Sequence, residues 1–180
     1  MKIKAFGTTV VIHYTFVVFV ALCFLTNNTA LAQVMLFASL HELAHIICLI
    51  LLGGKVDSIS LSFVGVGLRH STCFSYGKEC LFLLSGIFVN GLFWVAGIST
   101  DINGALFLIN ALPIYPLDGG RALKLVLNSL FDLKLSDSIY YFVSFISITV
   151  LFIYSVIAGN VSFLIITVYA VIYSLCNSYD

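Results

Sequence analysis

Charged residues are scarce in this chain of 180 residues, which has only 8 Lys and Arg and 8 Asp and Glu. They make up 9% of the sequence, against about 25% in soluble domains, while apolar residues reach 61%. Because the formal net charge is zero and no basic block is present, the sequence argues against nucleic acid as a partner. The composition is typical of an integral membrane protein that has the lipid bilayer as its surroundings.

Proline and paired cysteines are also lacking. The five cysteines have no C-x-x-C spacing, so neither a disulfide framework nor a cysteine metal site is expected. The only two prolines, Pro113 and Pro116, fall in one short segment that ends in Gly119 and Gly120. We expect the helix to break there. The basic N-terminus lacks a convincing signal-peptide cleavage pattern, so we expect the first apolar stretch to be retained.

Six apolar stretches reach or approach the roughly 20 residues that a membrane-spanning helix needs. Lys and Arg fall only at the N-terminus, after the second stretch and after the fourth, which places both termini in the cytoplasm under the positive-inside rule. Serines alternate with apolar residues between residues 53 and 77, a two-residue period that indicates a strand or hairpin. We therefore predict an all-α polytopic membrane protein with a short membrane-associated β-hairpin after the second helix. The stretches are residues 8–26, 30–52, 80–99, 102–117, 139–158 and 161–176.

An H-E-x-x-H motif, formed by His41, Glu42 and His45, lies inside the second apolar stretch. Residues i and i+4 share one face of a helix, so both imidazoles can reach one metal ion, with Glu42 close to a water at that metal. His45 is expected about 10 Å below the cytoplasmic end of its helix, at a rise of about 1.5 Å per residue. The pattern indicates a zinc site for hydrolysis.

Catalytic zinc takes three protein ligands, so a third donor must come from elsewhere in the chain. We favour Asp118, because an acidic residue at membrane depth is costly enough to indicate a function. His13 and His70 compete for the role. For His13, a hydrogen bond to a neighbouring helix explains the residue more simply than metal binding does. For His70, a solvated position in a loop does so.

Three motifs resemble those of the site-2 proteases, which are intramembrane zinc metalloproteases. They are residues 41–45 (HELAH), 85–90 (SGIFVN) and 110–120 (NALPIYPLDGG). The third motif and the six-helix layout look most like the stage IV sporulation protein FB branch, whose members cut a membrane-associated sigma-factor precursor. The motif resemblance covers roughly residues 8 to 125.

This resemblance implies roles for five side chains. It assigns His41, His45 and Asp118 to Zn²⁺, Glu42 to general acid–base catalysis, and Asn110 to holding the substrate. From the residue types alone, an interhelical hydrogen bond is also open for Asn110.

The resemblance also implies one metalloprotease domain over residues 1–180 in a bacterial cell membrane, with a catalytic core at about 30–125 and accessory helices at 8–26 and 139–176. The expected partners are a transmembrane or membrane-associated protein substrate, among them a sigma-factor precursor, and an inhibitory membrane protein. PDZ and cystathionine-β-synthase-type domains are not expected.

One departure and two alternatives accompany this interpretation. The element from Gly86 to Asn90 lacks the proline that often follows its glycine, and helix packing explains Asn90 at least as well as catalysis does. A general site-2 protease acting on anti-sigma factors or signal-peptide remnants fits the same motifs. A metal-ion transporter is the alternative from a different class, and it would require a site near the midplane with access from both faces.

Overall fold

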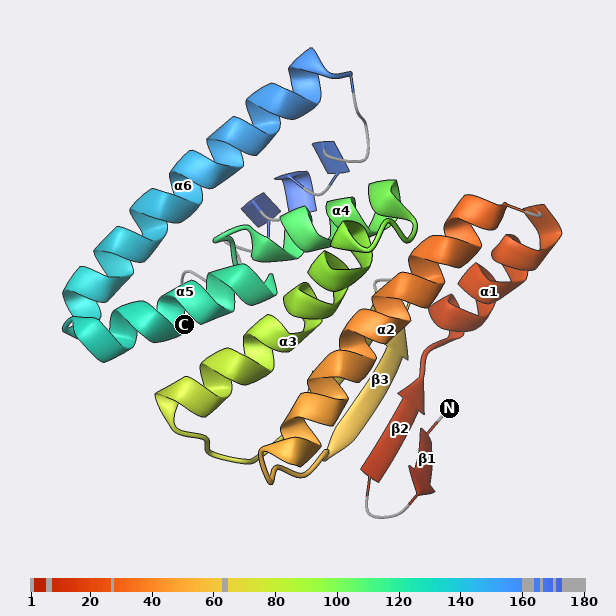
Figure 1. Cartoon of the computed structure of the whole chain (residues 1–180), viewed down its shortest axis with the longest axis horizontal. Coiled ribbons are helices and arrows are strands. Elements are labelled where there is room, and N and C mark those ends of the chain that lie inside the picture. The colour runs from red at the N-terminus through yellow and green to blue at the C-terminus, as the bar shows by residue number, and fades with distance from the viewer. Residues whose placement is uncertain are drawn as a thin grey trace. The chain divides into compact units, whose positions relative to one another are not determined.

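A computed structural model of the chain, drawn in Figure 1, has four strands and six helices among the residues that it describes. It describes residues 2–5, 8–26, 28–62, 65–159, 164–165, 167–169 and 171–172.

The elements occur in the order β1 (Lys2–Ala5), β2 (Thr8–Ile12), α1 (Tyr14–Thr26), α2 (Thr29–Leu51), β3 (Ser58–Ser62), β4 (Gly65–Arg69), α3 (Tyr76–Val95), α4 (Thr100–Ala111), α5 (Asp118–Leu130) and α6 (Leu133–Ile157). The chain divides into two compact units, Met1–Phe107 and Leu108–Asp180, with the boundary inside α4.

The first unit contains a four-stranded sheet with the strand order β1-β2-β3-β4. β3 and β4 form the antiparallel hairpin that the alternating serines predict, with Ser58 opposite Arg69 and Ser62 opposite Gly65. β2 runs parallel to β3, and β1 is antiparallel to β2. The expected helix over residues 8–26 is wrong for Thr8–Ile12, which form β2. All five of these residues are β-branched, and such side chains favour strands over helices.

Helix α2 begins and ends at clear signals. The Asn28 side chain accepts hydrogen bonds from the backbone N–H groups of Ala30 and Leu31, as a helix N-cap does. Gly53 follows the helix with a φ of +86°, a conformation that glycine adopts at little cost. The 23 residues between these signals give a helix about 34 Å long, at about 1.5 Å per residue.

One stripe of α2 is buried, and it consists of Phe37, His41, His45 and Leu49 at intervals of four residues. α2 packs against α3, the two helices running side by side in opposite directions (Figure 1). The buried residues of α3 are Phe82, Leu83, Gly86, Ile87 and Asn90. Both histidines of the H-E-x-x-H motif therefore face the interior of the first unit.

Three described helices are long and apolar enough to cross a membrane, namely α2, α3 and α6. They correspond to the predicted spans at 30–52, 80–99 and 139–158. α1 and α4 have 13 and 12 residues, fewer than a span of about 20 requires, and most of residues 161–176 lies outside the described part of the chain. The count of six spans with cytoplasmic termini therefore stays a prediction.

The second unit contains the segment in which the prolines predict a break. α4 ends at Ala111, and the backbone becomes helical again only at Asp118, so the break is confirmed. α5 packs against α6, with an ion pair between Lys124 and Asp137 and a hydrogen bond from Ser136 to Asn128.

Candidate metal centre

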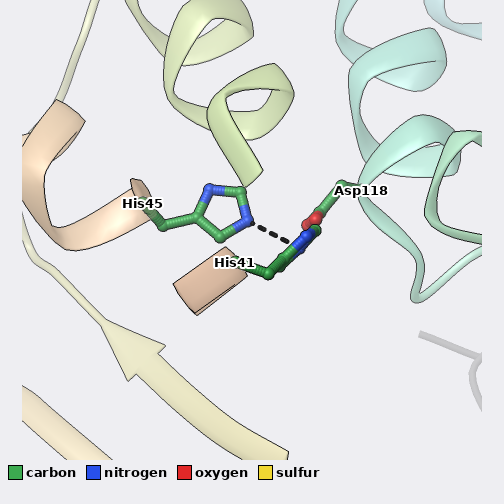
Figure 2. Close-up of side chains that lie close together, drawn as sticks. All are labelled: His41, His45 and Asp118. Atoms are coloured by element: carbon green, nitrogen blue, oxygen red, sulfur yellow. Dashed lines mark hydrogen bonds between the residues drawn. The ribbon is translucent and has the colours of Figure 1, made fainter. Parts of the chain in front are cut away.

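His41 and His45 lie one helical turn apart on the buried stripe of α2. Their Nε2 atoms are 3.2 Å apart, along the dashed line in Figure 2. Each residue is only 4% exposed. Two polar rings in such a setting need partners, because burying an unpaired polar group in an apolar interior is costly.

The Nδ1 atom of His45 lies between two acceptors. It is 2.8 Å from the backbone oxygen of Phe82 and 3.1 Å from the Ser85 hydroxyl oxygen. The hydroxyl donates its own hydrogen to the Phe82 oxygen, so it can only accept from His45. Nδ1 therefore carries the hydrogen, and the metal-binding lone pair is on Nε2.

The Nδ1 atom of His41 is 2.6 Å from Oδ1 of Asn90, which is also an acceptor. Both rings thus direct their N–H groups away from each other and their lone-pair nitrogens towards each other. This is how metal-binding histidines are commonly held, with the second ring nitrogen donating to a protein oxygen.

The spacing of the two Nε2 atoms fits one zinc ion. With Zn–N distances of about 2.0–2.1 Å and tetrahedral angles, two nitrogens on the same zinc lie about 3.3–3.4 Å apart. The 3.2 Å in the structure is close to this value. The histidine pair therefore fits zinc in both spacing and hydrogen-bond direction.

Gly86 on α3 lies against both rings. A Cβ atom at this position would be 2.5 Å from Nε2 of His41 and 2.5 Å from Nε2 of His45, closer than real Cβ atoms approach other atoms. Any side chain here would displace the lone-pair nitrogens. Gly86 belongs to one of the three motifs that resemble those of the site-2 proteases. Its close approach to both imidazole rings explains why a glycine stands at this position.

Asp118 occupies the first turn of α5 in the second unit. Its side chain is 13% exposed, and Oδ1 lies 4.0 Å from Nη1 of Arg121 one turn later. A carboxylate in the first turn is also favoured by the positive end of the helix dipole. Asp118 is thus a mostly buried carboxylate at the start of α5.

The two glycines after Asp118 let the broken segment pack against α5. A Cβ at Gly119 would lie 2.5 Å from the backbone oxygen of Ala111, and one at Gly120 would strike the backbone of Ile114. Ser144 of α6 donates a hydrogen bond of 2.7 Å to the backbone oxygen of Pro113. These contacts fix the segment that leads into Asp118.

In the described residues, the candidate metal ligands are His41 and His45 of the first unit and Asp118 of the second, all labelled in Figure 2. Two imidazole nitrogens and one carboxylate oxygen are a common donor set for catalytic zinc. Neither His13 nor His70 belongs to the group.

The other candidate residues have distinct surroundings. Glu42 is half-buried on α2, and Asn110 is half-buried near the end of α4. His13 is exposed between β2 and α1. His70 is packed rather than solvated, with its ring centroid 4.9 Å from that of Phe82.

Asn103 was not among the residues predicted from the sequence, yet it is 0% exposed and accepts a hydrogen bond of 3.0 Å from Asn90. Only its position as an amide in an apolar helix could have singled it out.

Two comparisons with known proteins found a match. Residues 84–154 match the sequence profile of Peptidase family M50. The fold is similar to that of the site-2 protease from Methanocaldococcus jannaschii, with a TM-score of 0.65 and 18% identity, over 94% of this chain and 91% of that one. The chain matches no curated protein sequence.

Together these findings give the chain the fold of a site-2 protease and a partial match to a metalloprotease family. The profile match contains the motifs from Gly86 to Asn90 and from Asn110 to Gly120 but excludes the histidine pair. The histidine geometry is therefore an observation separate from the family match. The class that the fold and the match suggest is an intramembrane metalloprotease.

Proposed function

We propose that this chain is a zinc-dependent intramembrane endopeptidase that hydrolyses a peptide bond of a membrane protein near the cytoplasmic face. The observation that carries the proposal is the pair of buried imidazoles on α2, with Nε2 atoms 3.2 Å apart and both Nδ1 atoms on acceptors. The M50 match over residues 84–154 supports it separately.

Zinc would be held by His41, His45 and Asp118. Asp118 is supported as the third ligand by its donor chemistry, its small exposed fraction and its place in the matched family region. When bound, zinc supplies a Lewis acid for the scissile carbonyl and lowers the pKa of water.

Glu42 is proposed as the general acid–base group. Its carboxylate would accept a proton from the attacking water and return it to the nitrogen of the leaving amine. Support comes from its position directly after His41 on α2 and from its half-buried state. Asn110, with an amide that can donate and accept, would hydrogen bond to the substrate backbone or to the developing oxyanion.

The substrate has to be extended, because a helical segment keeps its carbonyl groups in hydrogen bonds. β4 is an outer strand of the sheet and packs against α2. A peptide could add to this edge as a fifth strand, a common mode of peptide recognition. Since α2 carries the histidines, this edge would bring an extended chain towards them.

For the substrate, we propose a sigma-factor precursor or another membrane-associated protein. This part rests on the form of residues 110–120, which looks most like the sporulation protein FB branch. The proposal also includes an inhibitory membrane protein as a partner, and it places both chain termini in the cytoplasm.

The proposal can be tested with purified full-length protein in nanodiscs. The protein would be stripped of metal, reloaded with Zn²⁺, and incubated in ¹⁸O-labelled water with sigma-factor precursors and single-span membrane proteins. We expect products only after zinc is restored, with one ¹⁸O atom in each new C-terminal carboxyl group.

A second arm of the same experiment separates the alternative class. The protein would be placed in liposomes and zinc uptake measured. Zinc binding and zinc uptake without any cleavage of the substrate set would contradict the protease and favour a transporter.

A further inference from the structure

Behind His41 lies a chain of two buried amides that connects three helices of the first unit. Asn90 of α3 contacts the ring of His41, and Asn103 of α4 contacts Asn90. Both asparagines are 0% exposed. Their hydrogen bonds are therefore made inside the protein, where an unmade bond would carry the full cost of desolvation.

The far end of this chain has a fixed direction. Nδ2 of Asn103 is 2.8 Å from the backbone oxygen of Ile98 and 3.4 Å from that of Ser99. A backbone carbonyl can only accept, so Asn103 must turn its NH₂ group towards this turn between α3 and α4. The turn itself is held by a hydrogen bond from Ile98 N to the oxygen of Phe93.

The direction passes along the chain from one residue to the next. With its NH₂ group on the turn, Asn103 presents Oδ1 to Asn90, so Asn90 must donate through Nδ2. Asn90 then presents Oδ1 to His41, and the ring must donate from Nδ1. This leaves the lone pair of His41 on Nε2, facing Nε2 of His45.

We infer that Asn90 and Asn103 form a positioning relay that fixes the tautomer and ring orientation of His41 for metal binding. The inference deepens the proposed function, on which it rests. His45 needs no such relay, because a backbone oxygen and a serine hydroxyl already determine its donor. Asn103 thus acts on the metal site through its hydrogen bond to Asn90, which in turn contacts the ring of His41.

A double-mutant cycle tests the relay, with the dissociation constant of Zn²⁺ as the readout. Asn103→Leu removes the group that orients Asn90, and we expect zinc binding to weaken about 10-fold, the lower end of the 10–100-fold typical of partners behind a metal ligand. Asn90→Asp should stay within about threefold of the wild type, because both carboxylate oxygens accept and neither needs orienting.

The double variant separates positioning from packing. In the Asn90→Asp background, Asn103→Leu should cause no further weakening. An equal loss in both backgrounds would overturn the relay and leave Asn103 as a packing residue. Ser136→Ala is the matched control, since Ser136 is also 0% exposed and bonded to an amide but lies in the second unit.

A second measurement needs no variant and no metal. In metal-free protein with ¹⁵N-labelled histidine, the spectrum of His41 should be that of the tautomer with hydrogen on Nδ1. A hydrogen on Nε2 would overturn the relay even if the leucine variant failed to fold.

Neither readout involves peptide hydrolysis, so the two proposals can fail separately. Coupled zinc affinities without cleavage would sustain the relay and overturn the protease. Cleavage with uncoupled affinities would do the reverse.

Discussion

The two halves of the proposed metal site differ in how their ligands are held. His41 and His45 lie in the middle of a continuous helix, each 4% exposed, with both Nδ1 atoms on buried acceptors. Asp118 stands at the start of a helix, after a segment broken by two prolines, and its Oδ1 lies 4.0 Å from Nη1 of Arg121. The histidine half is fixed by helix geometry and hydrogen bonds, and the aspartate half by a turn packed against glycines.

This difference suggests how the two halves share the work. A helix holds the backbones of two ligands one turn apart at a constant spacing through its own geometry. A ligand after a broken segment depends on everything that shapes the segment, and non-helical backbone at membrane depth is tolerated only where protein or a wet cavity surrounds it. We expect the histidine half to set metal affinity and the aspartate half to complete the site.

The largest effect is expected from His45→Ala. Losing a ligand should weaken zinc binding by more than the roughly 100-fold that loss of a partner behind a ligand can cause, and cleavage should disappear. Zinc content after dialysis measures the first effect and product yield the second. His70→Ala is the control, and if it removed zinc equally, the ligand assignment would be wrong.

Asp118→Ala should weaken zinc binding by about 10–100-fold or more, again with loss of cleavage. The two histidines remain as a weaker site. Asp132→Ala removes another carboxylate from a helix start in the second unit, where it accepts from Leu135 N. That control should cost about 1 kcal/mol of stability and leave zinc affinity unchanged. Full zinc affinity in Asp118→Ala would contradict the third ligand.

Gly86→Ala should lower activity by about 100-fold, because its Cβ would push both Nε2 atoms out of position and a shift of about 1 Å can cost that much. Gly77→Ala is the control on the same helix, since nothing lies within 4 Å of its Cβ. Cleavage rates of the two variants, compared at saturating zinc, provide the measurement. Equal rates would show that the close approach of α3 is not needed.

The smallest effect is expected from Ser144→Ala, which removes the hydrogen bond to Pro113 and should cost about 1 kcal/mol of stability. Thermal unfolding of the second unit's helices reports the loss. Ser147→Ala removes only a bond within α6, to the oxygen of Val143, and should cost less. A larger loss in Ser147→Ala would mean that Ser144 does not anchor the segment.

Local signals in the sequence predicted several features of the fold. The four-residue interval of His41 and His45, the serine alternation in β3 and the break at Pro113 each follow from neighbouring residues. The β-branched run Thr8–Ile12 was also a local signal, but general apolar character outweighed it and predicted a helix.

The features that the sequence did not predict depend on contacts between residues far apart in the chain. Asn103 meets Asn90 across two helices, and nothing near either residue in sequence indicates the pairing. The same holds for His70, which packs on Phe82 of another element instead of facing solvent. Local periodicity does not indicate which distant side chain a residue will contact, because tertiary packing decides that contact.

The most direct test of the account is Glu42→Gln, with zinc content and cleavage measured on the same sample. The amide cannot accept the proton, so cleavage should fall by about 10²–10⁴-fold while zinc stays at the wild-type level. Glu79→Gln, which changes a half-buried carboxylate of α3, should cleave normally. Full peptide hydrolysis by zinc-loaded Glu42→Gln protein would contradict the central claim that this chain is a protease using Glu42 beside a histidine-bound zinc ion.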